Sequence, residues 1–217
     1  MCVLLLGGVT VRGAEGRWTE LCNGRDLEGW VQRGGKAEYR VESGEIVGRA
    51  VANTPNSFLC TARPYTNFIL ELEFRVATNL NSGIQIRSEC FPEAREVRAD
   101  GKTHKIPAGR VHGYQVEIDP SARAWTGGIY DEGRRGWLND LKEKEAARKA
   151  FSAETWNQLR IEARGSSIKT WLNGVAAADL TDSMTPGGFI ALQVHGVDAR
   201  DAGSEVRWRR LRIQELP

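Results

Sequence analysis

The chain has 217 residues, of which 41% are hydrophobic and seven are tryptophan. This is enough apolar material for a sizeable core, which excludes a disordered chain, and all-β domains of this length are routinely single units. Thirty basic and 28 acidic residues leave a formal charge of +2, and no basic stripe is interleaved with aromatic residues. Nucleic acid is therefore not an expected partner.

The first segment, residues 1–14 (MCVLLLGGVTVRGA), has a short apolar stretch followed by small residues. This pattern is typical of the apolar region and cleavage site of an export signal, although the basic start is missing. We interpret it as the remnant of such a signal and expect a periplasmic or secreted protein, with residues 15–217 forming one domain. A first β-strand is the alternative. The stretch is far shorter than the roughly 20 apolar residues of a membrane span.

The four cysteines are Cys2, Cys22, Cys60 and Cys90. They have no CxxC spacing, and no histidine is placed to complete a zinc site, so we predict no metal site. If Cys2 leaves with the signal, three cysteines remain and at most one disulfide can form.

Alternating apolar and polar residues predict many short strands. Residues 18–45 are rich in Gly, Asn and Asp, which favours turns joined to short strands. Phe68–Val76 (FILELEFRV) then alternates strictly, as a half-buried strand does. Similar runs recur at 83–88, 113–119, 126–132, 158–163, 167–172, 189–195 and 205–214. Asn173 and Gly174 stand between two such runs and predict a type I′ hairpin turn.

Two segments differ from this pattern. Residues 138–151 (LNDLKEKEAARKAF) are rich in helix formers and predict the one helix, with Asn139 or Asp140 able to cap it. Residues 91–110 are polar without periodicity, which predicts a long loop at a rim or lid. We therefore predict an all-β jelly-roll sandwich of two antiparallel sheets with one short helical insertion.

Three predicted strands share an outward face rich in polar side chains. Alternation places on it Gln115, Glu117 and Asp119 from 113–119, Gln85 and Arg87 from 81–87, and Gln193 and His195 from 191–195. Lysine, common on merely solvated strand faces, is absent from these positions. Amides, carboxylates and an arginine are what a polyhydroxylated sugar needs. The alternative is a solvated face held by ion pairs such as Arg87 with Glu117.

Glu117 and Asp119 lie two residues apart on one strand face, a separation of roughly 6.6 Å. This distance permits the acid/base pair of a glycosidase. His195 would add a group that titrates near neutrality, and a structural histidine is the alternative. The sequence contains no GxSxG elbow, HExxH motif or P-loop.

Six strings in the chain resemble one known family. They are LCNGRDLEGW (21–30), NSGIQIR (81–87), GYQVEID (113–119), TGGIY (126–130), ETWNQLRIEARGSSIKTWLNG (154–174) and IALQVHG (190–196). Together they resemble the 3-keto-disaccharide hydrolase domain, a bacterial family with a concanavalin A-like jelly roll. The resemblance runs from about Trp18 to Glu215. Cys22 stands where the family usually has Phe.

The resemblance implies cleavage of a small glycoside or oligosaccharide whose sugar a separate sugar 3-dehydrogenase has oxidised at C3. A C3 ketone acidifies the C2–H bond, so a modest base can remove that proton and the aglycone can leave from C1 before water adds. We predict Glu117 and Asp119 as the acid/base carboxylates, with His195 as the alternative base. The predicted substrate-binding residues are Gln85, Arg87, Gln115, Tyr130, Asp131 and Gln193. No cofactor is expected.

Two other functions stay open at this point. A non-catalytic carbohydrate-binding module is the first, because concanavalin-like sandwiches serve as lectins as readily as enzymes. A structural or interaction protein is the second. Carboxylates on the shared face favour the enzyme, since a pure binding module would favour exposed aromatic platforms.

Overall fold

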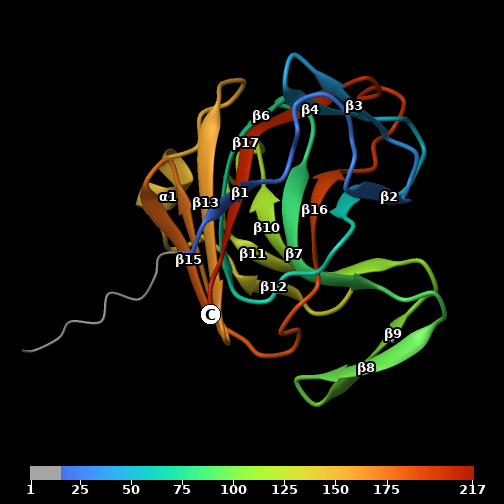
Figure 1. Ribbon diagram of the computed structural model, residues 1–217, viewed down its shortest axis with the longest axis vertical. Coiled ribbons are helices and arrows are strands. Elements are labelled where there is room, and N and C mark those ends of the chain that lie inside the picture. The colour runs from blue at the N-terminus through green and yellow to red at the C-terminus, as the bar shows by residue number, and fades with distance from the viewer. Residues whose placement is uncertain (1–15) are drawn as a thin grey trace, which may run out of the picture.

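The computed structural model describes residues 16–217. Two large antiparallel sheets pack face to face, and a separate two-stranded hairpin extends beside them (Figure 1). The predicted export signal at 1–14 lies outside the described residues. Within the described residues, no helix is long and apolar enough to cross a membrane.

Sheet A has eight strands in the order β15-β14-β13-β6-β17-β4-β3, with β1 paired to β17. Its strands are β1 (Trp18–Glu20), β3 (Glu38–Glu42), β4 (Glu45–Arg49), β6 (Phe68–Val76), β13 (Asn157–Arg164), β14 (Ser167–Leu172), β15 (Val175–Thr181) and β17 (Glu205–Glu215).

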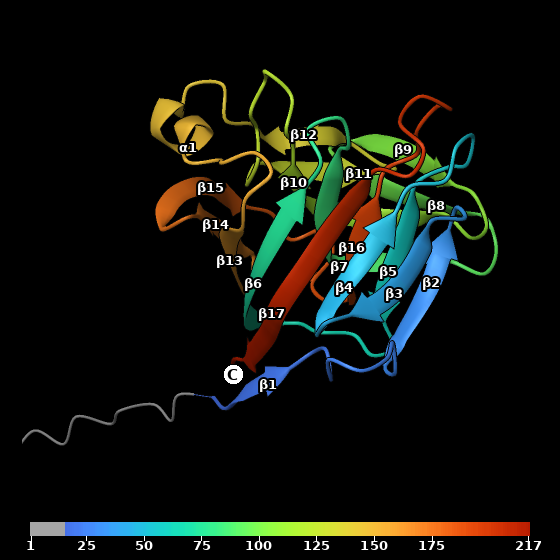
Figure 2. The same cartoon turned by 90° about the horizontal axis from the view of Figure 1, so that it is seen from above.

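Sheet B has seven strands in the order β12-β11-β10-β7-β16-β5-β2. Its strands are β2 (Trp30–Gly34), β5 (Ser57–Thr61), β7 (Ser82–Cys90), β10 (Val111–Ile118), β11 (Ile129–Glu132), β12 (Gly136–Asn139) and β16 (Phe189–Val194). Figure 2 shows β17 and β4 of sheet A in front of β16 and β7 of sheet B. The predicted sandwich of two antiparallel sheets is confirmed.

The core lies between the sheets because alternate residues of each strand face it. The predicted strand Phe68–Val76 is β6 with the same bounds, and its five alternating apolar side chains are buried. They pack with Ile84 and Ile86 of β7 and with Tyr114 of β10 in one cluster. The opposite face of each sheet is therefore the outer face.

The hairpin turn between β14 and β15 was predicted correctly. Asn173 and Gly174 have φ angles of 49° and 80°. A type I′ turn needs positive φ at both central residues, and Asn followed by Gly adopts that conformation most readily.

The predicted helix is much shorter than expected. Residues 136–139 form β12 at the edge of sheet B, and only Glu145–Lys149 is helical (α1). No side chain caps α1, so the predicted cap by Asn139 or Asp140 is wrong. The Nδ2 atom of Asn139 instead donates to the carbonyl oxygen of Asp179 in sheet A. Tertiary pairing overrides helix propensity here.

The predicted long loop at 91–110 contains two strands. They are β8 (Arg95–Ala99) and β9 (Lys102–Ile106), which pair as a hairpin turning at Asp100 and Gly101. Most of its side chains are polar and exposed on both faces, so the alternation that signals a half-buried strand is missing. The three described cysteines, Cys22, Cys60 and Cys90, are free thiols.

Candidate functional site

A polar cavity of about 280 Å³ opens on the outer face of sheet B. Its lining residues are Asn81, Gln115, Glu117, Arg123, Tyr130, Glu132, Trp137, Gln193 and His195. Five predicted site residues are among them, namely Gln115, Glu117, Tyr130, Gln193 and His195. These residues come from β10, β11 and the end of β16, which are distant in sequence but close in the sheet.

A glycine at the centre of the sheet makes room for one of the side chains that line the cavity. In the register of sheet B, Gly83 of β7 lies between Glu117 of β10 and Gln193 of β16. A Cβ atom at Gly83 would lie 2.6 Å from the side chain of Gln115, closer than carbon atoms approach. The Gln115 side chain therefore occupies the space above Gly83.

Glu117 is held by a chain of buried amides. Its Oε1 accepts a hydrogen bond from Nδ2 of Asn81 at 2.7 Å, and its Oε2 accepts one from Nε2 of Gln115 at 2.8 Å. Gln115 in turn accepts from Nε2 of Gln85 at 2.7 Å, and Gln85 accepts from the Ser88 hydroxyl at 2.6 Å. Gln85 is completely buried, so it orients Gln115. Contrary to the prediction, it does not line the cavity.

The environment of Glu117 favours proton exchange near neutral pH. Burial raises the pKa of this carboxyl to about 7, and the hydrogen bonds from Asn81 and Gln115 only partly offset the rise. The nearest ion-pair partner is Arg123, whose Nη2 lies 3.8 Å from Oε1. A carboxyl with a pKa near the working pH suits a general acid or base.

One wall of the cavity combines aromatic rings with Arg123. Trp137 meets Tyr130 and Trp125 edge to face, with centroid distances of 5.4 Å and 4.7 Å. The guanidinium carbon of Arg123 lies 5.1 Å from the Trp137 centroid and 4.9 Å from that of Trp125. Arg123 belongs to a surface loop, and this stacking fixes the position of its guanidinium group.

Asp119 does not line the cavity, contrary to the prediction. Its carboxylate accepts hydrogen bonds from the backbone N–H groups of Ser121 and Trp125 and from Nε of Arg123 at 2.7 Å. Although burial pushes its pKa upward, these bonds lower the pKa of Asp119 overall. Asp119 therefore stays charged and positions Arg123.

Arg87 also lies away from the cavity, because β7 contains a bulge. The register with β16 shifts between Phe189 and Ala191, and Arg87 has a φ angle of 46°. An extra residue turns the following side chain to the other face of a strand. The Arg87 guanidinium is buried and donates to the carbonyl oxygens of Thr66 and Gly165 at 2.7 Å and 2.6 Å. It has no contact with Glu117.

Asp131 faces the interior, on the side opposite Tyr130 and Glu132. It is completely buried and forms ion pairs of 2.6 Å with both Arg134 and Arg135. Alternation along β11 makes this placement necessary once Tyr130 lines the cavity. Asp131, predicted to bind substrate, therefore does not line the cavity.

Two further titratable groups lie in the cavity. Glu132 accepts a hydrogen bond of 2.5 Å from Arg110, and burial raises its pKa while Arg110 and then His195 oppose the rise. His195 is exposed, and its Nδ1 lies 2.7 Å from the carbonyl oxygen of Gly196. The cavity thus holds a buried carboxyl at Glu117 and a more accessible imidazole at His195.

Sequence analysis missed four lining residues, namely Asn81, Arg123, Glu132 and Trp137. Glu132 could have been found, since strand alternation puts residues 130 and 132 on the same face. Arg123 could not, because it belongs to a loop whose path depends on Asp119. Within residues 16–217, no group of three or more His, Cys, Asp or Glu residues is arranged to hold a metal ion.

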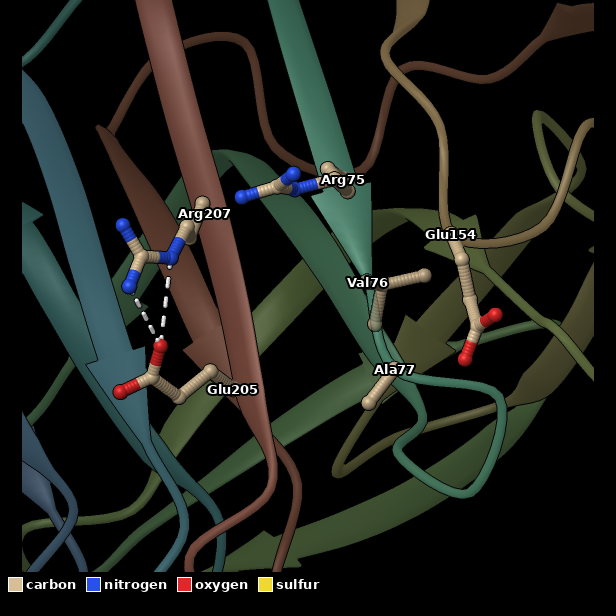
Figure 3. A pocket seen from close by; sticks show the side chains of 6 residues that line it. All are labelled: Arg75, Val76, Ala77, Glu154, Glu205 and Arg207. Atoms are coloured by element: carbon tan, nitrogen blue, oxygen red, sulfur yellow. Dashed lines mark hydrogen bonds and ion pairs between the residues drawn. The ribbon is translucent and has the colours of Figure 1, made fainter.

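A hollow on the outer face of sheet A has a different character (Figure 3). It measures about 310 Å³ and is lined by Arg75, Val76, Ala77, Glu154, Glu205 and Arg207. The Arg207 guanidinium lies 2.8 Å from the Glu205 carboxylate and also contacts Glu45 at 3.3 Å. Burial acts to raise the pKa of Glu205, but Arg40 and Arg207 lower it overall, so this hollow holds a paired, charged carboxylate.

Solved structures show that other proteins share this fold. A Parabacteroides distasonis protein, provisionally described as a glycosyl hydrolase, has 19% identity and a TM-score of 0.58, with 94% of this chain and 95% of that chain covered. The carbohydrate-binding module CBM66 from Bacillus subtilis has 17% identity and a TM-score of 0.58, covering 86% and 96%. A Bacillus subtilis protein with a galectin-like fold has 11% identity and a TM-score of 0.59, covering 92% and 98%.

At the level of sequence, the chain has no match among curated proteins. The model of the 3-keto-alpha-glucoside-1,2-lyase-like domain, however, matches residues 17–214. This range includes both sheets and every residue of the cavity, and it confirms the resemblance drawn from the six strings. The chain therefore belongs to the 3-keto-alpha-glucoside-1,2-lyase-like family.

Proposed function

We propose that this protein cleaves glycosides whose sugar carries a ketone at C3, by elimination across the C1–C2 bond. The observation that carries the proposal is Glu117, a buried carboxyl with a pKa of about 7 that lines a polar cavity. The family to which the chain belongs supports the same chemistry, since its description names a 1,2-lyase of 3-keto glucosides.

The proposed reaction begins with the removal of a proton from carbon. A base removes the C2 proton, and the C–H electron pair forms the enolate of the C3 ketone. The enolate then re-forms the ketone as a double bond develops between C1 and C2 and the C1–O bond to the aglycone breaks. An acid protonates the leaving oxygen. Addition of water across the new double bond completes a net hydrolysis.

The cavity provides a group for each step. Glu117 is the base, because its pKa leaves an ionised fraction at neutral pH. His195 is exposed at the cavity and protonates the leaving aglycone on the solvent side. Arg123, fixed by Asp119, provides positive charge beside the site where the enolate develops. Arg87, predicted from sequence to bind the substrate, does not line the cavity.

The substrate of this reaction must come from an oxidation. A glycoside of an ordinary sugar has a hydroxyl at C3, so a separate dehydrogenase acting at that carbon has to supply the ketone. In this proposal the protein works after export, together with such a dehydrogenase.

A non-catalytic carbohydrate-binding role is the second candidate. The aromatic wall of Trp137 and Tyr130 favours it, because sugar rings pack against such surfaces. The fold shared with the CBM66 module supports it as well. This role requires sugar binding without any turnover.

The deciding experiment compares a 3-keto glycoside with its unoxidised parent. Each is incubated with the protein in deuterated water, and aglycone release and deuterium at C2 are followed by NMR. The proposal expects release from the 3-keto glycoside alone, with deuterium at C2 of the sugar product. Binding of either sugar without release would support the binding module. Release from the parent without exchange at C2 would indicate ordinary acid-assisted hydrolysis.

A further inference from the structure

Gln193 has a completely buried side chain at the wall of the cavity. Neither its Oε1 nor its Nε2 has a hydrogen-bond partner in the part of the chain that the structure describes. Buried side-chain amides in proteins are paired in the large majority of cases, because an unpaired one opposes folding. An unpaired amide at the wall of a cavity therefore points to a ligand that pairs with it.

The surroundings of Gln193 explain why it stays unpaired. Its neighbours across the sheet are Gly83 on β7 and Phe58 on β5, neither of which has a polar side chain. Ala191 precedes it on the same face of β16. Gln115, an amide of the same cavity, already accepts from Gln85 and donates to Glu117. The donor and acceptor of Gln193 are thus left for a molecule in the cavity.

We propose that Gln193 recognises the oxidised carbon of the sugar, an inference that rests on the proposed function. Its Nε2 donates to the ketone oxygen at C3, and its Oε1 accepts from a hydroxyl on a neighbouring carbon. An amide presents one donor and one acceptor side by side, which matches an adjacent ketone and hydroxyl. The donated hydrogen bond strengthens as charge develops on the oxygen of the enolate.

The register of sheet B places Glu117 and Gln193 on either side of Gly83. Glu117 and Gln193 both neighbour Gly83, so their backbones lie about 10 Å apart, or two strand spacings. A sugar ring lying over the Gln115 side chain, which covers Gly83, can present its C2 proton to Glu117 and its C3 oxygen to Gln193. Gly83 adds no side chain between them.

The variant Gln193→Glu tests this inference because it exchanges the Nε2 donor for an acceptor of similar shape. The dissociation constants of the 3-keto glycoside and its parent are measured by calorimetry in a Glu117→Gln background, which prevents turnover. We expect binding of the 3-keto glycoside to weaken by about tenfold or more. The parent should weaken by less than about threefold, because its C3 hydroxyl can donate to the new carboxylate. Gln158→Glu, an exposed position on β13, is the control and should change neither constant.

A second variant tests the unpaired amide without any sugar. Gln193→Met keeps the length of the side chain and removes both polar groups, so the unliganded protein should have an equal or higher Tm. A clear fall in Tm would mean that the amide is paired within the protein, which would overturn the inference.

The outcomes separate this inference from the proposed function. If Gln193→Glu weakens both ligands equally while the wild type still cleaves the 3-keto glycoside, the role of Gln193 is wrong and the function stands. If the wild type binds the 3-keto glycoside without cleaving it, and Gln193→Glu reverses the preference for this glycoside over its parent, the role of Gln193 stands and the proposed function is wrong. Failure of the wild type to bind either sugar would overturn both.

Discussion

The outer faces of the two sheets carry the same residue types in opposite arrangements. On sheet A, Glu71 accepts hydrogen bonds of 2.6 Å from both Arg160 and Arg212, and these arginines lower its pKa overall although burial acts to raise it. On sheet B, Glu117 has amides as its hydrogen-bond partners, and burial raises its pKa to about 7. A strand carboxylate becomes a candidate acid or base when it is buried with amides in place of arginines.

The largest expected effect is a difference in activity between variants of Glu117 and of Glu71. Glu117→Gln keeps the size and hydrogen-bonding reach of the side chain but removes the basic oxygen, so cleavage of a 3-keto glycoside should slow by about 10² to 10⁴. Glu71→Gln on the outer face of sheet A should leave the rate within a factor of about three, which is far below that range. Steady-state kinetics on both variants checks the contrast, and equal losses would remove Glu117 from the mechanism.

The pH dependence of stability should also differ in sign between the two sites. The pKa of Glu117 is raised in the folded protein, so its stabilising effect is full below the unfolded pKa and is lost as the pH rises through about 7. The loss is on the order of 3 kcal/mol. The lowered pKa of Glu71 has the reverse effect, with stability lost as the pH falls.

Urea unfolding between pH 4 and 8 measures these dependences. The free energy of unfolding of the wild type minus that of Glu117→Gln should decrease as the pH rises toward about 7. The same difference for Glu71→Gln should fall only at the acid end of this range, below the ordinary glutamate pKa, and stay level above it. If the two free-energy differences changed with pH in the same direction, the environments assigned to Glu117 and Glu71 would be wrong.

A smaller effect is expected from Gly83→Ala. The new methyl group would collide with the Gln115 side chain, which must then move away from Glu117. Displacement of a catalytic group by about 1 Å can reduce a rate by about a hundredfold, so we expect a loss between tenfold and about a hundredfold. Gly44→Ala, at an exposed turn, controls for a general cost of replacing glycine. An unchanged rate in Gly83→Ala would show that Gln115 does not orient Glu117.

The smallest effect on activity is expected from Asp119→Asn. Asn can no longer form the ion pair with Arg123 and weakens the hydrogen bonds that shape the loop from 121 to 125, so we expect a stability loss of about 1 kcal/mol. The rate should fall only a few-fold, because Asp119 acts through Arg123. Thermal unfolding and kinetics test this together. A loss as large as that of Glu117→Gln would instead restore Asp119 as an acid/base group.

Sequence reasoning located half of the cavity because strand alternation is a local property. Gln115 and Glu117 lie on one regular stretch of β10, and Gln193 likewise lies between two apolar residues of β16. The same reasoning failed at Arg87, where a bulge reverses the alternation. Bulges depend on the partner strand, so a single strand read alone does not reveal them.

Local sequence therefore determined the sandwich class, the extent of β6, the turn at Asn173 and Gly174 and the family resemblance, since periodicity and turn chemistry depend on neighbouring residues. Only the tertiary structure decided which polar groups are chemically useful. Arg123 reaches the cavity through Asp119, Glu117 is buried among amides from β7 and β10, and Gln193 lies between residues without polar side chains. These outcomes depend on hydrogen-bond partners and burial, which are set by segments far apart in the chain.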